Sequence, residues 1–452
     1  MTTHNPRQRI LQFLPSLSPD MFMPGRVGLS AHFPFNDPTV RYFYDARTAI
    51  YQWARQWNSG DWEILFPSYF EGVELNALLA AKVRPRFYPV HRNMRVEPAE
   101  VLRCLGPKTK AIYLIHYVGF PGPVQELSVA CRARRLLLIE DCAQALLSNC
   151  AERPLGSFGD VAIFSIRKTL PVPDGGALVA GTNGACNLPR TQPSPLTPAV
   201  AYAAASLRRH FDLREEHVNR WILRKMADIG KLVFPRSSAW GPARRESIFD
   251  PAQGTWGMSC LSRTILNGQD PENIIERRRR NYLHMRSLLS RRAKPLFEEL
   301  PSGVCPWSYP LQVDKKEVFL SRLLECGVEG VNSWYANHPA VPKGVFHESE
   351  ELRRTVIQLP CHHDLDDADI RYIADQVNKA TRGYARTVII ETIWFLLTSS
   401  RCSVPDLKRR TPEFQRNSQS GFRRGLLMAG RRVDRNNTYV FEVAPQRIAE
   451  IA

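Results

Sequence analysis

A lysine that closely follows a predicted strand is the residue of this sequence best suited to nucleophilic chemistry. Lys168 comes three residues after Ser165, which ends the apolar run 161–165, and Arg167 precedes it directly. A lysine that is desolvated or close to other cations loses its proton more readily and becomes a nucleophile. The Ser165 hydroxyl could donate to a phosphate. A lysine in a loop is more commonly a solvated surface charge, so Lys168 needs supporting residues.

A carboxylate at the end of a neighbouring predicted strand is the first such residue. Asp141 ends the run 136–141, where burial would require a cationic or hydrogen-bonding partner. A protonated pyridine nitrogen is one such partner, and a cationic ring is the electron sink that pyridoxal phosphate (PLP) chemistry requires. Capping of a following helix is an equally good interpretation of Asp141.

The start of a predicted helix could bind an anion. Asp45 is a good N-cap, Arg47 adds a positive charge and Thr48 adds a hydroxyl. Free backbone N–H groups and the helix dipole favour phosphate at this end of a helix. Many helices begin in this way, so the feature is informative only together with Lys168 and Asp141.

The predicted elements are expected to bring these three groups to one edge of a sheet. Strands are predicted over 63–66, 86–90, 111–116, 136–141, 161–165 and 177–180, and helices over 45–57, 71–82, 98–105 and 125–134. Apolar strands that alternate with helices indicate a mainly parallel sheet covered by helices on both faces. Ligands in such α/β sheets bind beyond the carboxyl ends of the strands.

The length of 452 residues indicates two or three domains. We expect an N-terminal arm over 1–40 and a large domain over 41–290, which includes an atypical helical segment at 183–255. A smaller α+β domain is predicted over 295–382, and a basic, loosely ordered tail over 383–452.

Two further helices are predicted inside or next to the atypical segment. One covers about 199–231, and the other, over 272–293, contains the run Glu276 to Arg280 with four consecutive arginines. A run of like charges on a helix usually marks a face exposed to solvent, and we expect the same here.

The net charge of +17 favours anionic partners, such as phosphorylated small molecules or nucleic acid. The segment 401–452 supplies +6 of this excess, and no basic stripe with interleaved aromatic residues marks a nucleic-acid site elsewhere. Nucleic-acid binding is therefore kept only as a minor alternative.

The remaining composition favours a cytoplasmic protein without a metal site. The ten cysteines form no C-x-x-C pair and show no zinc spacing. The N-terminal residues contain no long apolar segment of the secretory kind. The most apolar late stretch, 388–397, is too short to span a bilayer.

Several short motifs occur in the order typical of one enzyme family. Residues 116–121 correspond to the family pattern VHLYGxP, and residues 140–145 to the family pattern EDAAQA. Residues 156–177 correspond to the family pattern GSFGDxxxFSF…K-x-L…DGGA, and residues 359–369 to the family pattern LPLHPxLTDEDV. Over about 40–180 and 258–380 the chain resembles the DegT/DnrJ/EryC1/StrS family of PLP-dependent sugar aminotransferases. It resembles an outlying branch, because the interval from Ser165 to Lys168 is short and Asp45 to Thr48 replace the family's Gly-Thr-Ser phosphate turn.

The resemblance implies a fold-type-I PLP enzyme that works as a homodimer. Lys168 would form the Schiff base with the cofactor, Asp141 would pair with the pyridine nitrogen, and Gln144 would contact the phenolic oxygen of the ring. The phosphate would be held by Ser165, Arg47 and Thr48, and the ring face would be covered by Tyr69 or Phe70.

The implied reaction moves an amino group from glutamate to a keto-sugar linked to a nucleotide, with Lys168 transferring protons. A sugar dehydratase is less consistent with the sequence, because dehydratases of this family lack the lysine. An aminotransferase for a substrate other than a sugar remains an alternative. So does a binding or regulatory protein that has kept the fold without the catalysis.

Overall fold

The computed structural model describes residues 10–382 except 24–27, 58–60, 182–187, 189, 215–248 and 335. The predicted tail over 383–452, and the part of the predicted helix 199–231 beyond residue 214, lie outside the described residues. No helix within the described ranges is both long and apolar enough to cross a membrane.

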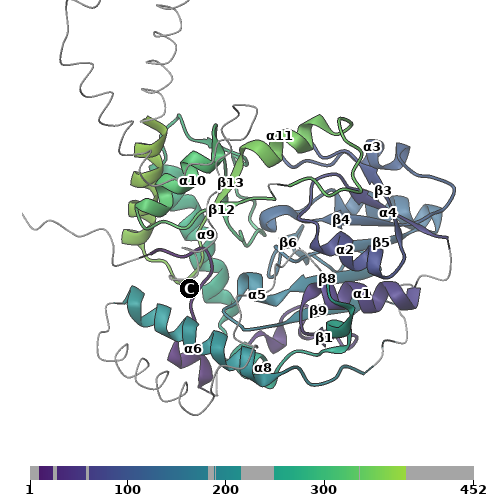
Figure 1. Cartoon of the computed structure of the whole chain (residues 1–452), viewed down its shortest axis with the longest axis horizontal. Helices are drawn as coiled ribbons and strands as arrows, with labels where there is room; N and C mark the ends of the chain where they lie inside the picture. The colour runs from purple at the N-terminus through teal and green to yellow at the C-terminus, as the bar shows by residue number, and fades with distance from the viewer. Residues whose placement is uncertain are drawn as a thin grey trace, which may run out of the picture. The chain divides into compact units, whose positions relative to one another are not determined.

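Within the described ranges, seven strands form one sheet in the order β1-β9-β8-β5-β4-β2-β3 (Figure 1). They are β1 (Arg41–Phe43), β2 (Glu63–Pro67), β3 (Arg84–Tyr88), β4 (Thr109–Ile115), β5 (Leu137–Asp141), β8 (Val161–Ser165) and β9 (Gly176–Ala180). The five strands from β8 to β3 are parallel, whereas β9 runs antiparallel to both β8 and β1. The predicted mainly parallel sheet is confirmed, and β1 is a strand that the sequence reading missed.

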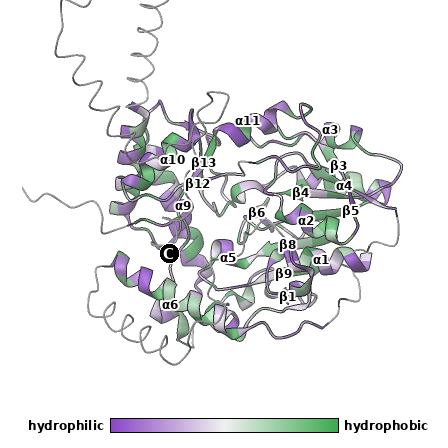
Figure 2. Cartoon of the chain, viewed as in Figure 1, coloured by the Kyte–Doolittle hydropathy of each residue, from purple (hydrophilic) through white to green (hydrophobic). Residues whose placement is uncertain are grey.

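The residues of the central strands are apolar without alternation, which requires cover on both faces of the sheet. All five residues of β8 and of β9 are buried, and in β4 only Lys110 is exposed. Figure 2 shows apolar residues along these strands. The cover includes α1 (Ala46–Trp57) against β8 and β9, and α4 (Val124–Arg134) against β4 and β5.

Two shorter helices and a hairpin complete this part of the chain. The helix α2 (Val73–Ala80) packs on α1 and β3, and α3 (Pro98–Arg103) begins at a proline, which suits the first turn of a helix. The hairpin joins β6 (Asn149–Cys150) to β7 (Arg153–Pro154).

A second sheet has four antiparallel strands in the order β10-β11-β13-β12. Its members are β10 (Lys294–Pro295), β11 (Tyr309–Gln312), β12 (Val331–Asn332) and β13 (Val356–Leu359), and the helices of this region are α10 (Lys316–Glu325), α11 (His347–Thr355) and one over 367–382. An α+β arrangement is predicted for this stretch. The domain boundaries themselves remain predictions.

The segment between the sheets contains α6 (Leu196–Leu213), α8 (Cys260–Asn267) and the basic helix α9 (Pro271–Leu288). The expectation of a solvated arginine face on α9 is wrong at Arg278, which is 1% exposed. Its guanidinium donates to the carbonyl oxygens of Thr169, Pro306 and Trp307. Backbone carbonyls accept from its two terminal nitrogens while its buried Nε has no hydrogen-bond partner, so this buried cation is held by partners other than a carboxylate.

Candidate active site

The carboxyl ends of the parallel strands bring the predicted site residues to one edge of the central sheet. Asp141 ends β5 and Ser165 ends β8, and these two strands are neighbours. Ser165 lies in register with Gly176, which in turn lies in register with Phe43, just before α1. A Cβ atom at Gly176 would overlap the backbone of Asp45, so only glycine allows the start of α1 to approach β9 this closely.

Asp141 is buried and its carboxylate is only partly satisfied by the protein. One oxygen accepts from the Tyr113 hydroxyl at 2.7 Å and the other accepts from the backbone N–H of Ala143 at 2.8 Å. No helix follows Asp141, so it does not act as the helix cap that the sequence left open. A carboxylate has about four acceptor positions, so Asp141 can accept further hydrogen bonds.

Gln144 lies just beyond Asp141 and has an amide group with an unmatched donor. Its Oε1 accepts from the backbone N–H of Val118 at 2.9 Å, whereas its buried Nε2 has no hydrogen-bond partner. A buried donor without a partner costs about 1 to 3 kcal/mol. An acceptor on a bound molecule would remove this cost.

Lys168 belongs to α5 (Ile166–Thr169), a single helical turn that begins directly after Ser165. Its Nζ lies 3.6 Å from a carboxylate oxygen of Glu71 and 5.7 Å from the centre of the Trp307 ring. The Lys168 side chain is 27% exposed, so the amine lies at the surface of the site and can be reached.

A second carboxyl group lies behind Glu71. Glu74, on the first turn of α2, accepts from the backbone N–H groups of Glu71 and Gly72 at 3.1 and 3.0 Å. Burial, together with the negative charges of Glu71 and Asp141, raises the pKa of Glu74 to about 7, while Lys168 acts in the opposite direction. Glu74 thus fixes the loop that carries Glu71.

The start of α1 differs from the predicted anion site. One oxygen of Asp45 accepts from the backbone N–H of Thr48 at 2.8 Å, as expected of an N-cap. The other oxygen pairs with Arg47 at 2.7 Å. Asp45 therefore places a carboxylate at the first turn of α1, where a phosphate was expected to bind to Arg47 and Thr48.

The predicted aromatic residues Tyr69 and Phe70 are both fully buried. The Tyr69 hydroxyl lies 3.1 Å from the Ser333 hydroxyl, and the Phe70 ring packs edge-on against Phe66. It is Glu71, the next residue, whose side chain reaches Lys168. The sequence reading missed Glu71 because a charged residue in a loop gives no signal by itself.

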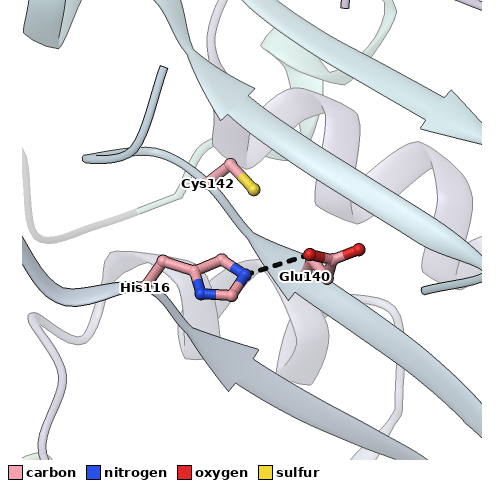
Figure 3. Close-up of side chains that lie close together, drawn as sticks. All are labelled: His116, Glu140 and Cys142. Carbon is pink, nitrogen blue, oxygen red and sulfur yellow. Dashed lines mark hydrogen bonds and ion pairs between the residues drawn. The ribbon is translucent and has the colours of Figure 1, made fainter. Parts of the chain in front are cut away.

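His116, Glu140 and Cys142 form a buried cluster behind the site (Figure 3). The carboxylate of Glu140 accepts from His116 Nε2 at 3.0 Å and from the backbone N–H groups of Gly156, Phe158 and Gly159. These four donors use the acceptor positions of the carboxylate, so the cluster holds the loop after β7 and offers no open metal site.

The comparisons with known proteins agree with this geometry. Residues 58–185 match the model of the DegT/DnrJ/EryC1/StrS aminotransferase family. A dTDP-4-dehydro-2,3,6-trideoxy-D-glucose 4-aminotransferase of Saccharopolyspora spinosa is 27% identical to this chain, over 70% of this chain and 78% of that protein. The GDP-perosamine synthase of Vibrio cholerae is 30% identical, over 27% of this chain and 34% of its own length.

Solved structures with the same fold include the aminotransferase TlmJ of Streptoalloteichus hindustanus, at a TM-score of 0.58 and 19% identity. The alignment covers 83% of this chain and all of that one. This likeness confirms the predicted α/β fold class, and the sequence matches confirm the predicted aminotransferase relationship. Over residues 58–185 the chain matches the DegT/DnrJ/EryC1/StrS aminotransferase family, and the relatives it resembles are sugar aminotransferases.

Proposed function

We propose that this chain is a PLP-dependent aminotransferase whose acceptor is a nucleotide-linked keto-sugar and whose amino donor is glutamate. The observation that carries the proposal is the placement of Lys168, Asp141 and Gln144, whose Nε2 has no partner, just beyond the ends of two neighbouring strands. The sugar substrate is supported by relatives that are named as sugar aminotransferases. We expect a cytoplasmic homodimer, as the resemblance implies.

The side chains present fit PLP. Asp141 has acceptor positions left for a ring N–H, and the free Nε2 of Gln144 is a donor suited to the ring hydroxyl oxygen. The Ser165 hydroxyl, which makes no capping bond to α5, would donate to the phosphate together with Arg47 and Thr48. When bound, PLP supplies an electron sink for carbanion chemistry.

In this arrangement Lys168 has two tasks. Its Nζ would link the cofactor to the chain and, once freed, would take up and give back the proton that the transfer requires. Asp141 would pair with the ring nitrogen through its remaining acceptor positions, and the Tyr113 hydroxyl that donates to its carboxylate holds it in place. Gln144 would orient the ring through its free Nε2.

A second candidate is a binding protein that uses this fold without catalysis, and Asp45 is the observation that favours it. A carboxylate at the first turn of α1 repels a phosphate that would otherwise be attracted to the helix dipole. The two functions differ in whether the chain reacts with PLP through Lys168 and then with an amino donor.

The deciding measurement is the visible absorbance of the purified full chain with PLP, for wild type and Lys168→Ala, before and after glutamate is added. Lys343→Ala, an exposed lysine, serves as the matched control. The proposal expects a band that requires Lys168, is unchanged in the control and is bleached by glutamate. If no band depends on Lys168, the catalytic assignment is wrong and the binding protein is favoured.

A bleached band would leave the acceptor to be identified. Incubation of the glutamate-treated protein with dTDP- or GDP-linked keto-sugars should restore the band and release an aminated sugar nucleotide. Restoration by simple keto-acids alone would instead indicate a substrate other than a sugar.

A further inference from the structure

The short helical turn that carries Lys168 is completed by donors from distant parts of the chain. The last carbonyls of any helix lack partners within the helix, and a turn as short as α5 (Ile166–Thr169) cannot supply them. The indole N–H of Trp307 donates to the carbonyl of Lys168 at 2.6 Å, and Arg278 donates to the carbonyl of Thr169 at 2.9 Å.

The backbone of Trp307 is held by hydrogen bonds at both its N–H and its carbonyl. Its N–H donates to the carbonyl of Val118 at 2.9 Å, and its own carbonyl accepts from Arg278 at 3.0 Å. Gly119 packs against the same segment so closely that a Cβ atom there would lie 2.5 Å from the carbonyl oxygen of Cys305. The indole therefore has little freedom to move relative to the loop at 118–119.

The same loop also holds Gln144. The N–H of Val118 donates to Gln144 Oε1 at 2.9 Å, while the carbonyl of Val118 accepts from Trp307. Val118 has a φ of 58°, a conformation that a β-branched residue adopts only where its surroundings enforce it. One continuous set of hydrogen bonds thus runs from Lys168 through Trp307 and Val118 to Gln144.

The indole ring also lies near the Lys168 amine. Nζ is 5.7 Å from the ring centre, within the range in which an ammonium is attracted to the face of a tryptophan ring. The carboxylate of Glu71, 3.6 Å from Nζ, contributes an ion pair from another loop. Trp307 thus contacts the backbone and the head group of the same lysine.

We propose that Trp307 is a positioning residue that holds Lys168 in a fixed relation to Gln144, and so compensates for the short interval between Ser165 and Lys168. The inference rests on the proposed function, because it assigns Lys168 and Gln144 to the same bound cofactor. It adds a residue that neither the sequence motifs nor the cofactor chemistry indicated.

The test compares Trp307→Phe, which keeps an aromatic ring and loses the indole N–H, with wild type and with Trp57→Phe. Trp57 stacks on Trp53 at the far end of α1 and provides a matched loss of an indole N–H. In the cofactor-free protein, Lys168 is labelled with acetic anhydride and its rate of modification is measured by peptide mass spectrometry against exposed Lys343.

We expect the Trp307→Phe variant to label Lys168 roughly 3- to 10-fold faster than wild type, as the loss of one hydrogen bond suggests. We also expect weaker PLP binding by a similar factor and a shifted or broadened lysine-dependent absorbance band, with a fall in melting temperature no larger than that of Trp57→Phe. The Trp57→Phe variant should match wild type in all of these measurements except the melting temperature.

Equal labelling rates and equal bands in wild type and Trp307→Phe would overturn the inference. The inference would also be overturned if a fall in melting temperature accounted for the whole change in labelling rate and PLP binding, because Trp307 would then have only a structural role. If wild type shows no lysine-dependent band, the proposed function fails, while the labelling rate still shows whether Trp307 holds Lys168.

Discussion

Substitution of Glu74 by glutamine should change how the stability of the protein depends on pH. Burial, with the charges of Glu71 and Asp141, raises the pKa of Glu74 from 4.5 to about 7 in the folded chain. The proton on Glu74 therefore stabilises the folded state. This contribution is fully present below the unfolded-state pKa of 4.5 and is lost as the pH rises through about 7.

The magnitude follows from the two pKa values. A difference of roughly 2.5 pH units, at 1.36 kcal/mol per unit, corresponds to about 3 kcal/mol of stability lost by wild type between pH 4.5 and pH 8. The Glu74→Gln variant has no proton to lose. It does lose one of the two bonds that Glu74 accepts from the N–H groups of Glu71 and Gly72, at a cost of about 1 kcal/mol.

The two effects oppose each other, so the order of stability should reverse with pH. We expect the variant to be about 1 kcal/mol less stable than wild type at pH 5 and about 2 kcal/mol more stable at pH 8. Urea unfolding at pH 5, 6, 7 and 8 measures the difference, and exposed Glu298→Gln is the matched control. A difference that stays constant from pH 5 to pH 8 would refute the reasoning, because Glu74 would then be ionised throughout.

Three further substitutions test other parts of the site. Arg278→Met leaves three buried carbonyls without a donor and should lower the free energy of unfolding, measured with urea at neutral pH, by at least about 2 kcal/mol. An unchanged urea midpoint would contradict the burial of this charge. Gly176→Ala should lower stability by about 3 kcal/mol in the same assay because its Cβ overlaps Asp45, whereas Gly181→Ala, with ordinary contacts, should not. Asp45→Ser keeps a capping oxygen but removes the negative charge, so PLP should bind roughly 2- to 5-fold tighter, as measured by absorbance titration. Weaker binding would mean that the Asp45 carboxylate does not oppose the phosphate.

The elements of the central sheet could be read from the sequence because each depends on local information. The runs 161–165 and 136–141 are continuously apolar up to a polar residue, so their ends and the positions of Ser165 and Asp141 were predicted to within one residue. Asp45 was identified as a helix cap because the side chain of an N-cap bonds within its own first turn.

The residues that were missed depend on contacts between distant segments. Arg278 stands in a run of four arginines, and nothing in that run distinguishes the fully buried one from its less buried neighbours. Glu71 and Trp307 lie 97 and 139 residues from Lys168 in the chain, and neither belongs to a motif. Short-range spacing holds no information about such pairs.

The sequence by itself determined the order of strands and helices and the residue types at the strand ends, because periodicity and capping act over a few neighbouring residues. Only the tertiary structure decided which groups face Lys168 and which guanidinium is buried. These features arise when strands and loops far apart in the chain are packed together, since burial and charge are properties of the assembled surroundings and not of the residue alone.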